Sequence, residues 1–88
     1  MPVLDLYPNP VQDQVVMLRM DQPGRSDGSA IVTIYDGEGR RAMTTTLPFQ
    51  NGLLHAALEL SPDLTSGVYF VKVQAGEVSR IGRLVIQR

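Results

Sequence analysis

Apolar and polar residues alternate in short runs along this chain, and each run is followed within a few residues by Gly, Pro, Asn or Asp. Such alternation is typical of β-strands, because successive side chains of a strand point to opposite faces of a sheet. The clearest run has an inward face of Leu54, Ala56, Leu58 and Leu60 and an outward face of His55, Ala57 and Glu59. No run shows a convincing helical period, so the pattern predicts an all-β protein.

Six runs predict strands clearly, and Val3–Leu6 predicts a possible short seventh strand. The clear runs are Gln14–Met20, Ala30–Tyr35, Arg40–Leu47, Leu54–Leu60, Val68–Val73 and Val78–Gln87. In the first of these, Val15 and Met17 share one face and Val16, Leu18 and Met20 the other, so both faces should be at least half covered. The run Ala30–Tyr35 is apolar enough to be a central strand.

The connections carry the residues that turns require. Asp36-Gly37-Glu38-Gly39 supplies two glycines for positive φ and an aspartate that can bond its own downstream backbone, which predicts a tight hairpin turn. Asp21–Ser29 is predicted to be an exposed connection and Pro48–Gly52 a second turn. In the longer connection Ser61–Gly67, we expect Gly67 to be left-handed and Leu64 to pack back into the core.

Seven short strands in 88 residues cannot close a roomy barrel. Two stacked sheets about 10 Å apart would bury both sets of inward residues, which predicts a small immunoglobulin-like antiparallel β-sandwich. Cys and Trp are both absent, so this sandwich would lack the disulfide and the core tryptophan of antibody domains.

The segment Leu6-Tyr7-Pro8-Asn9-Pro10-Val11 stands just before the clear strands. Its two prolines remove two backbone donors, fix two φ angles near about −65° and disfavour helical conformation at the residues before them. We expect a stiff, extended corner, with residues 1–6 as a linker remnant or short first strand and 7–88 as one domain.

Composition excludes several classes of protein. With no cysteine there is neither a disulfide framework nor a thiolate metal site, and the formal net charge of −1 gives no field suited to nucleic acid or an anionic membrane. No apolar run approaches the roughly 20 residues of a transmembrane helix, and Met1–Leu6 is too short and uncharged for a secretory signal peptide.

No candidate catalytic or metal site withstands comparison with an ordinary structural role. His55 is the one histidine, and its strand position predicts a surface side chain rather than part of a Ser-His-Asp relay. Asp36 and Glu38 lack the further oxygen ligands and terminal glutamate of a calcium loop. We therefore expect neither an enzyme nor a cofactor.

Exposed aromatic platforms would point to a sugar-binding sandwich, and this chain has few aromatic residues. Only Phe49, in a turn, and Phe70, opposite in phase to Tyr69, are predicted to be exposed. Arg80, Arg83 and Arg88 fall in the last nine residues with no acid among them. They are either a solvated face or a docking surface.

Taken in order, the motifs of the chain resemble the type A C-terminal sorting domain of the type IX secretion system (Por secretion), found in Bacteroidetes. The pieces are Tyr7-Pro8-Asn9-Pro10-Val11 with Asp13, Ile34-Tyr35-Asp36 with Gly39-Arg40, Leu58-Glu59-Leu60-Ser61 with Leu64, Gly67-Val68-Tyr69-Phe70-Val71-Lys72-Val73, and Arg83-Leu84-Val85-Ile86. The resemblance covers nearly the whole chain. One departure is Arg83, where the family commonly has lysine, so a contact that needs lysine geometry is in doubt.

The resemblance implies a non-catalytic signal. A cargo protein would reach the periplasm by its own signal peptide, and this domain would then present it to the outer-membrane translocon and a shuttle protein. A sortase-like peptidase would usually remove the domain by cutting before Leu6 or outside the present chain. The cargo would pass from the periplasm to the outer membrane, the cell surface or the medium.

As a hypothesis, the recognition residues are those of the family motifs. They are Tyr7, Pro8, Asn9, Pro10, Asp36, Gly39, Arg40, Gly67, Tyr69, Lys72, Arg83, Leu84, Val85 and Ile86. The last predicted hairpin would offer backbone edges, apolar side chains and Arg83 to the machinery. Deletion of Arg83–Arg88 should then leave cargo in the periplasm.

The competing class is an extracellular adhesion or carbohydrate-binding module, which shares the sandwich fold. A row of exposed aromatic residues would favour it, and the sequence predicts none. Self-association through an exposed edge strand is a further possibility.

Overall fold

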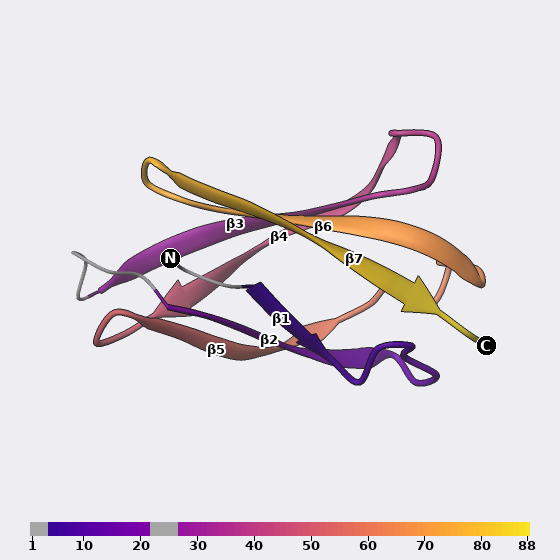
Figure 1. The fold of residues 1–88 in the computed structure, drawn as a ribbon, viewed down its shortest axis with the longest axis horizontal. Helices are drawn as coiled ribbons and strands as arrows, with labels where there is room; N and C mark the ends of the chain where they lie inside the picture. Colours follow the sequence, from indigo (N-terminus) through magenta and orange to yellow (C-terminus); the bar gives the residue numbers. More distant parts are fainter. Residues whose placement is uncertain (1–3, 22–26) are drawn as a thin grey trace.

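The computed structural model describes residues 4–21 and 27–88, and within these ranges the chain forms β-strands and no helix (Figure 1). The strands are β1 (Leu4–Tyr7), β2 (Val15–Asp21), β3 (Gly28–Tyr35), β4 (Arg41–Phe49), β5 (Leu53–Glu59), β6 (Gly67–Ala75) and β7 (Val78–Ile86). The predicted all-β class is confirmed. Each predicted strand is present, and most boundaries agree within one or two residues.

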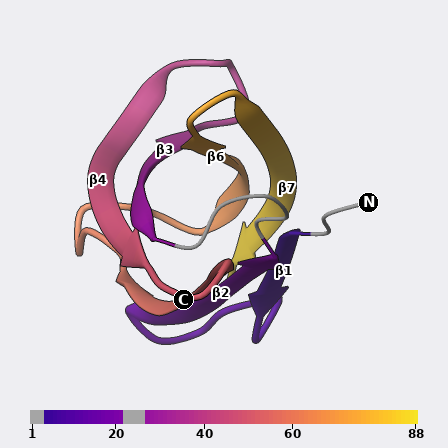
Figure 2. The ribbon, with the colours of Figure 1, turned by 90° about the vertical axis from the view of Figure 1, so that its left-hand side faces the viewer.

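The strands form two antiparallel sheets that face each other (Figures 1 and 2). One has three strands in the order β1-β2-β5, and the other has four in the order β4-β3-β6-β7. The central position predicted for β3 is confirmed, since it pairs with both β4 and β6. The architecture is the immunoglobulin-like sandwich, in which β4 pairs with β3 and so belongs to the same sheet as β6 and β7.

The core lies between the sheets and follows the period-two pattern of the sequence. Its buried apolar side chains are Val11, Val16, Leu18, Met20, Ala30, Val32, Ile34, Phe49, Leu54, Leu58, Leu60, Leu64, Tyr69, Val71, Val73, Ala75, Leu84 and Ile86. Leu64 comes from the connection between β5 and β6, and its predicted return to the core is confirmed. Full burial of a leucine or valine side chain contributes about 1.5–3 kcal/mol, so this cluster is the main source of stability.

One prediction about exposure is wrong. Phe49 is buried rather than exposed, because Gly28 stands directly opposite on β3 and leaves room for its ring; a Cβ at Gly28 would lie 2.7 Å from the ring's Cζ. The prediction that both faces of β2 are at least half covered is confirmed at the apolar positions, since Val15 is 43% exposed, Met17 is half-buried, and Val16, Leu18 and Met20 are buried.

The turns also differ in detail. At 36–39 only Gly39 has a positive φ, of 83°, whereas Gly37 does not. Gly67 has a φ of 158°, which is nearly extended and not left-handed helical. Pro48 is part of β4, opposite Ser29, and the reversal into β5 occurs after Phe49. Since β4 is an edge strand, the missing N–H of a proline is tolerated there.

Residues 1–3 and 22–26 lie outside the described ranges. They include Val3 of the first predicted strand and the middle of the predicted connection Asp21–Ser29. At the edges of that connection, β2 runs to Asp21 and β3 begins at Gly28. Leu4–Leu6 are strand residues, so the short-strand interpretation describes them better than a linker remnant. The described part of the chain has no helix long and apolar enough to cross a membrane.

Candidate functional site

Most residues predicted to form the sorting motifs gather at one end of the sandwich. This end, which we call the motif end, consists of the segment after β1 (residues 8–11), the β3–β4 turn (36–40), the β5–β6 connection (60–66) and the last residues of β7 with the chain end (83–88). Figure 1 shows these four segments on the side where the C-terminus lies. Segments far apart in sequence therefore meet in one place.

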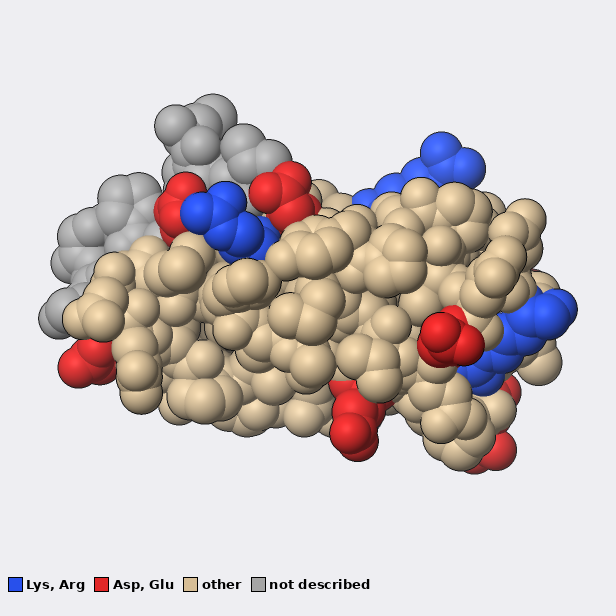
Figure 3. All heavy atoms as spheres, turned by 90° about the horizontal axis from the view of Figure 1, so that it is seen from below, with Lys and Arg blue, Asp and Glu red and all other residues tan. Residues whose placement is uncertain are grey.

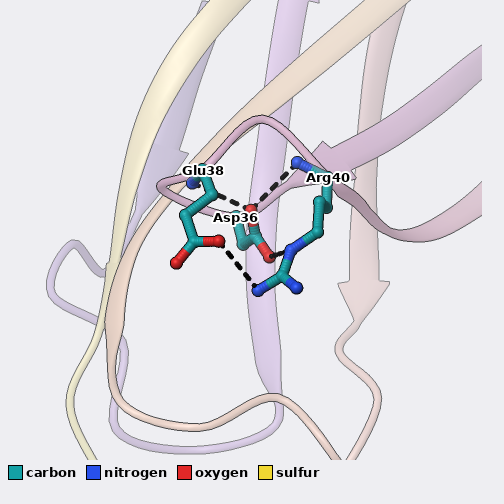
Figure 4. A network of polar contacts seen from close by, with 3 residues as sticks. All are labelled: Asp36, Glu38 and Arg40. Carbon is teal, nitrogen blue, oxygen red and sulfur yellow. Dashed lines mark hydrogen bonds and ion pairs between the residues drawn. The ribbon is translucent and has the colours of Figure 1, made fainter.

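Asp36 organises the β3–β4 turn. Its Oδ1 accepts hydrogen bonds from the backbone N–H groups of Glu38 and Arg40, each at 2.9 Å, which confirms the predicted bonding to its own downstream backbone. The Arg40 guanidinium lies 3.2 Å from Asp36 Oδ2 and also 3.2 Å from Glu38 Oε2 (Figure 4). The short reversal into β4 follows from these bonds together with the positive φ of Gly39.

These contacts stabilise the ionised carboxylate. The backbone N–H of Arg40 is the main cause of a pKa of Asp36 below its ordinary value of 3.8. Desolvation acts in the opposite direction, and the N–H of Glu38 and the Arg40 guanidinium lower the pKa further. The carboxylate is thus a structural anion of the turn.

Beside this turn lies the start of β6. Tyr69 is buried, and its hydroxyl donates a 2.8 Å hydrogen bond to the carbonyl of Thr65, the arrangement known as a tyrosine corner. A shallow hollow of about 360 Å³ is lined by both segments, including Asp36, Arg40, Gly67 and Tyr69. Four predicted motif residues thus meet although about thirty residues separate the two pairs.

Asn9 joins the N-terminal motif to the C-terminal one. Its side-chain Nδ2 donates to the carbonyl of Arg83 at 2.8 Å, and its Oδ1 accepts from the N–H of Val85 at 3.0 Å. The backbone of Val11 continues this pattern, since its N–H donates to the carbonyl of Val85 and its carbonyl accepts from the N–H of Gln87. Asn9 and Val11 act as a short parallel strand along the end of β7. We call this arrangement the Asn9 clasp, and the edge groups that it covers are not free for pairing.

The end of the chain is held at the same place. Arg88 donates from its guanidinium to the carbonyls of Pro62 and Leu64, at 3.3 and 2.6 Å. Its backbone N–H donates to Ser66 Oγ, and the Ser66 hydroxyl donates to its carbonyl. Within β7, Leu84 and Ile86 are buried in the core, whereas Val85 faces outward and is half-buried.

Tyr7 lies at the end of β1 on the outer face of the three-stranded sheet. It is 42% exposed, and its hydroxyl is hydrogen-bonded to His55 Nε2 at 2.7 Å. His55 is exposed on β5, as predicted. Pro8 and Pro10 follow in the bend that carries the chain towards β7, and their side chains are exposed.

Lys72 and Arg83 are predicted site residues that lie on the outer face of the four-stranded sheet. Their neighbours include the exposed side chains of Ile31, Phe70 and Ile81, of which the sequence analysis identified only Phe70. The available signal was an isoleucine at the outward position of an alternating strand, as at Ile31 and Ile81. This signal is weak in a sequence, because single exposed apolar residues are common on protein surfaces.

Other kinds of site find little support in the described residues. They contain no group of three or more His, Cys, Asp or Glu side chains placed to hold a metal ion. The exposed aromatic side chains among them, Tyr7 and Phe70, lie on opposite sheets and form no row.

Comparison with known proteins agrees with the motifs. The family described as "Secretion system C-terminal sorting domain" matches residues 5–87, nearly the whole chain. A search of curated proteins finds no significant match.

Proposed function

Because the chain belongs to the family of secretion-system C-terminal sorting domains, the signals of type IX secretion, we propose that it directs an attached cargo protein to the type IX outer-membrane translocon. In this role the domain binds the translocon and its outer-membrane shuttle protein and catalyses no reaction. The cargo passes from the periplasm to the outer membrane and then to the cell surface or the medium. The observation that carries the proposal is the family match over residues 5–87.

The geometry supports this role, because the family motifs serve the fold and its surface rather than a reaction centre. Tyr69, Leu84 and Ile86 build the core, and Asp36 and Asn9 fix the turn and the clasp. The predicted residues Lys72 and Arg83 lie at outward positions of β6 and β7, where their charges face away from the core. A partner protein can dock on a preformed surface with little backbone movement, so this role requires no pocket.

A sortase-like peptidase would release the domain after export, and its cut would fall upstream of Leu4. Leu4–Tyr7 pairs with β2 along its whole length, so its backbone is held in the sheet. Proteases bind extended, unpaired backbone, which is unavailable within β1. The peptidase would therefore act on the residues before this strand.

The test is a fusion of residues 1–88 to a periplasmic reporter with its own signal peptide. In a host with the type IX machinery, the reporter should appear at the cell surface or in the medium. In the same host without the translocon, it should stay in the periplasm. Periplasmic retention in the intact host, with the domain folded, would refute the assignment, and glycan binding by the retained protein would support the rival binding module.

The deletion of Arg83–Arg88 is a weaker test than the sequence suggested. It removes Leu84 and Ile86, which are 0% and 1% exposed, together with the bonds of Arg88. Loss of either core side chain alone costs about 2–5 kcal/mol, so the truncated domain should not fold. Retention of such a fusion would report unfolding as readily as loss of a signal.

A further inference from the structure

We propose that the outer face of the four-stranded sheet docks on a protein whose surface presents carboxylates around an apolar centre. We call this surface the basic face and define it by Ile31, Val68, Phe70, Lys72, Ile81 and Arg83. The inference rests on the proposed sorting function and identifies the surface through which the export machinery recognises the domain.

The basic face carries an unusual share of the exposed apolar side chains. The described residues include six large hydrophobic side chains that are exposed, and four of them lie here: Ile31 (52%), Val68 (40%), Phe70 (40%) and Ile81 (65%). All four occupy the phase opposite to the buried residues of β3, β6 and β7. A contiguous exposed apolar patch is a common mark of a protein interface.

Register brings Val68, Phe70 and Ile81 together on β6 and β7 and places the cations among them, whereas Ile31 stands opposite Gln74 and extends the face on β3 beyond Lys72. Phe70 stands directly opposite Arg83, and Lys72 stands directly opposite Ile81. Directly opposed Cβ atoms are about 4.5–5.5 Å apart in an antiparallel pair. The two cations therefore lie beside an aromatic and an aliphatic side chain on β6 and the edge strand β7.

The charges on this sheet have one sign. Strands β3, β4, β6 and β7 contain no Asp or Glu, whereas β1, β2 and β5 contain Asp5, Asp21 and Glu59 with a single Arg19. Neither Lys72 nor Arg83 makes an ion pair with a described residue. Carboxylates on a partner would supply the counter-charges, and this complementarity favours an acidic protein surface.

Charge also argues against a second copy as the occupant. A symmetric dimer through this face would set cations against cations. The outer face of the three-stranded sheet, seen in Figure 3, mixes acidic and basic side chains among uncharged ones. This face and the basic face lie on opposite sides of the sandwich, so stacking one copy on the next through them would give an open stack rather than a closed dimer. An anionic lipid surface is usually read by clusters of about four to eight cations, more than this face presents.

The Asn9 clasp favours recognition through the side chains of the basic face rather than through the backbone edge of β7. Asn9 and Val11 occupy the outward backbone groups near the end of β7. A partner strand could pair there only after displacing them. Recognition through exposed side chains needs no such rearrangement.

The experiment compares matched variants of the reporter fusion. Lys72→Glu/Arg83→Glu should lower the surface fraction about tenfold or more, because it converts two attractions into repulsions. Arg83→Glu alone should lower the surface fraction in part, whereas Arg19→Glu, the matched single reversal on the other sheet, should export normally. A photo-activatable cross-linker at position 81 should capture a component of the export machinery, and at position 15 it should not. Circular dichroism and thermal melting of the isolated domain check that each variant folds.

The outcomes separate this inference from the proposed function. If the wild-type fusion is not exported, the function fails. If it is exported and the folded double variant is exported equally well, or the two cross-linker positions capture alike, only the docking face is wrong. A wild-type dimer that Ile81→Ser dissociates would assign the face to a second copy. Binding to anionic lipid vesicles that the double variant loses would assign it to the membrane. Either of these two results would overturn the proposal that the basic face docks on an acidic protein surface.

Discussion

At the scale of single residues, Asn9 is the motif residue whose role the structure defines most directly. Its amide supplies both a donor and an acceptor to β7, as a strand residue would. An aspartate of the same shape would keep the acceptor for Val85 and lose the donor for Arg83. Asn9→Asp would therefore keep one of the two side-chain bonds to β7.

Replacing Asn9 with alanine should therefore loosen the clasp. Loss of two partly solvated hydrogen bonds costs about 1 kcal/mol, which for a domain of this size lowers the melting temperature by roughly 4–8 °C. The measurement is thermal unfolding followed by circular dichroism. Gln12→Ala is the control, because Gln12 is exposed and makes no hydrogen bond to the described residues. Equal melting temperatures for Asn9→Ala and wild type would show that the clasp is energetically irrelevant.

The stability of the folded domain depends on pH through the carboxylate of Asp36. Its pKa in the folded domain lies below the ordinary 3.8, so the ionised turn stabilises the fold above that value, and this contribution is lost as the pH falls through the folded pKa. Asp36→Asn should unfold at lower denaturant than wild type at pH 7, and the gap should narrow as the pH falls below the ordinary pKa of 3.8 and through the lower folded pKa.

Urea titrations at several pH values would measure this gap. Asp63→Asn is the control, because the Asp63 carboxylate makes no hydrogen bond or ion pair with the described residues. A gap of constant size down to pH 2 would mean that the charge of Asp36 does not matter. In that case only the shape of the turn would contribute.

At the scale of elements, β1 crosses close to β7 although the two strands belong to different sheets. Gly82 makes this approach possible, because a Cβ at its position would lie 3.1 Å from Leu6 Cδ1 and 3.2 Å from Leu4 Cδ2. The first strand and the last thus close the sandwich on the side seen at the right of Figure 2.

Gly82→Val should push β1 away from β7. The added methyl groups would overpack this contact at a cost of about 1–3 kcal/mol, against which the higher strand propensity of valine is a smaller gain. Thermal unfolding would show a lower melting temperature. Ser79→Val, an outward position of the same strand, provides the matched control. If Gly82→Val melted as high as Ser79→Val, the close approach would be unimportant.

At the scale of the whole molecule, the motif residues divide between the core and the surface. Tyr69, Leu84 and Ile86 are internal, whereas Val68, Phe70 and Arg83 of the same motif pieces are exposed on the basic face. Within one strand, alternate motif positions therefore build the domain and face its surroundings. The motif end gives the domain its shape, and the basic face is the surface we propose that the partner reads.

The sequence by itself determined the strands, their inward faces and the family, because period two fixes the face of each side chain once a strand forms. It determined the bonding of Asp36 as well, because that turn is local. Only the tertiary structure decided which strands lie side by side. Hence the burial of Phe49 over Gly28, the bonds of Asn9 to β7 and the collection of Lys72, Ile81 and Arg83 on one face were beyond local pattern. Each of them depends on register between segments that are distant in the chain, and alternation along one strand does not specify its neighbour.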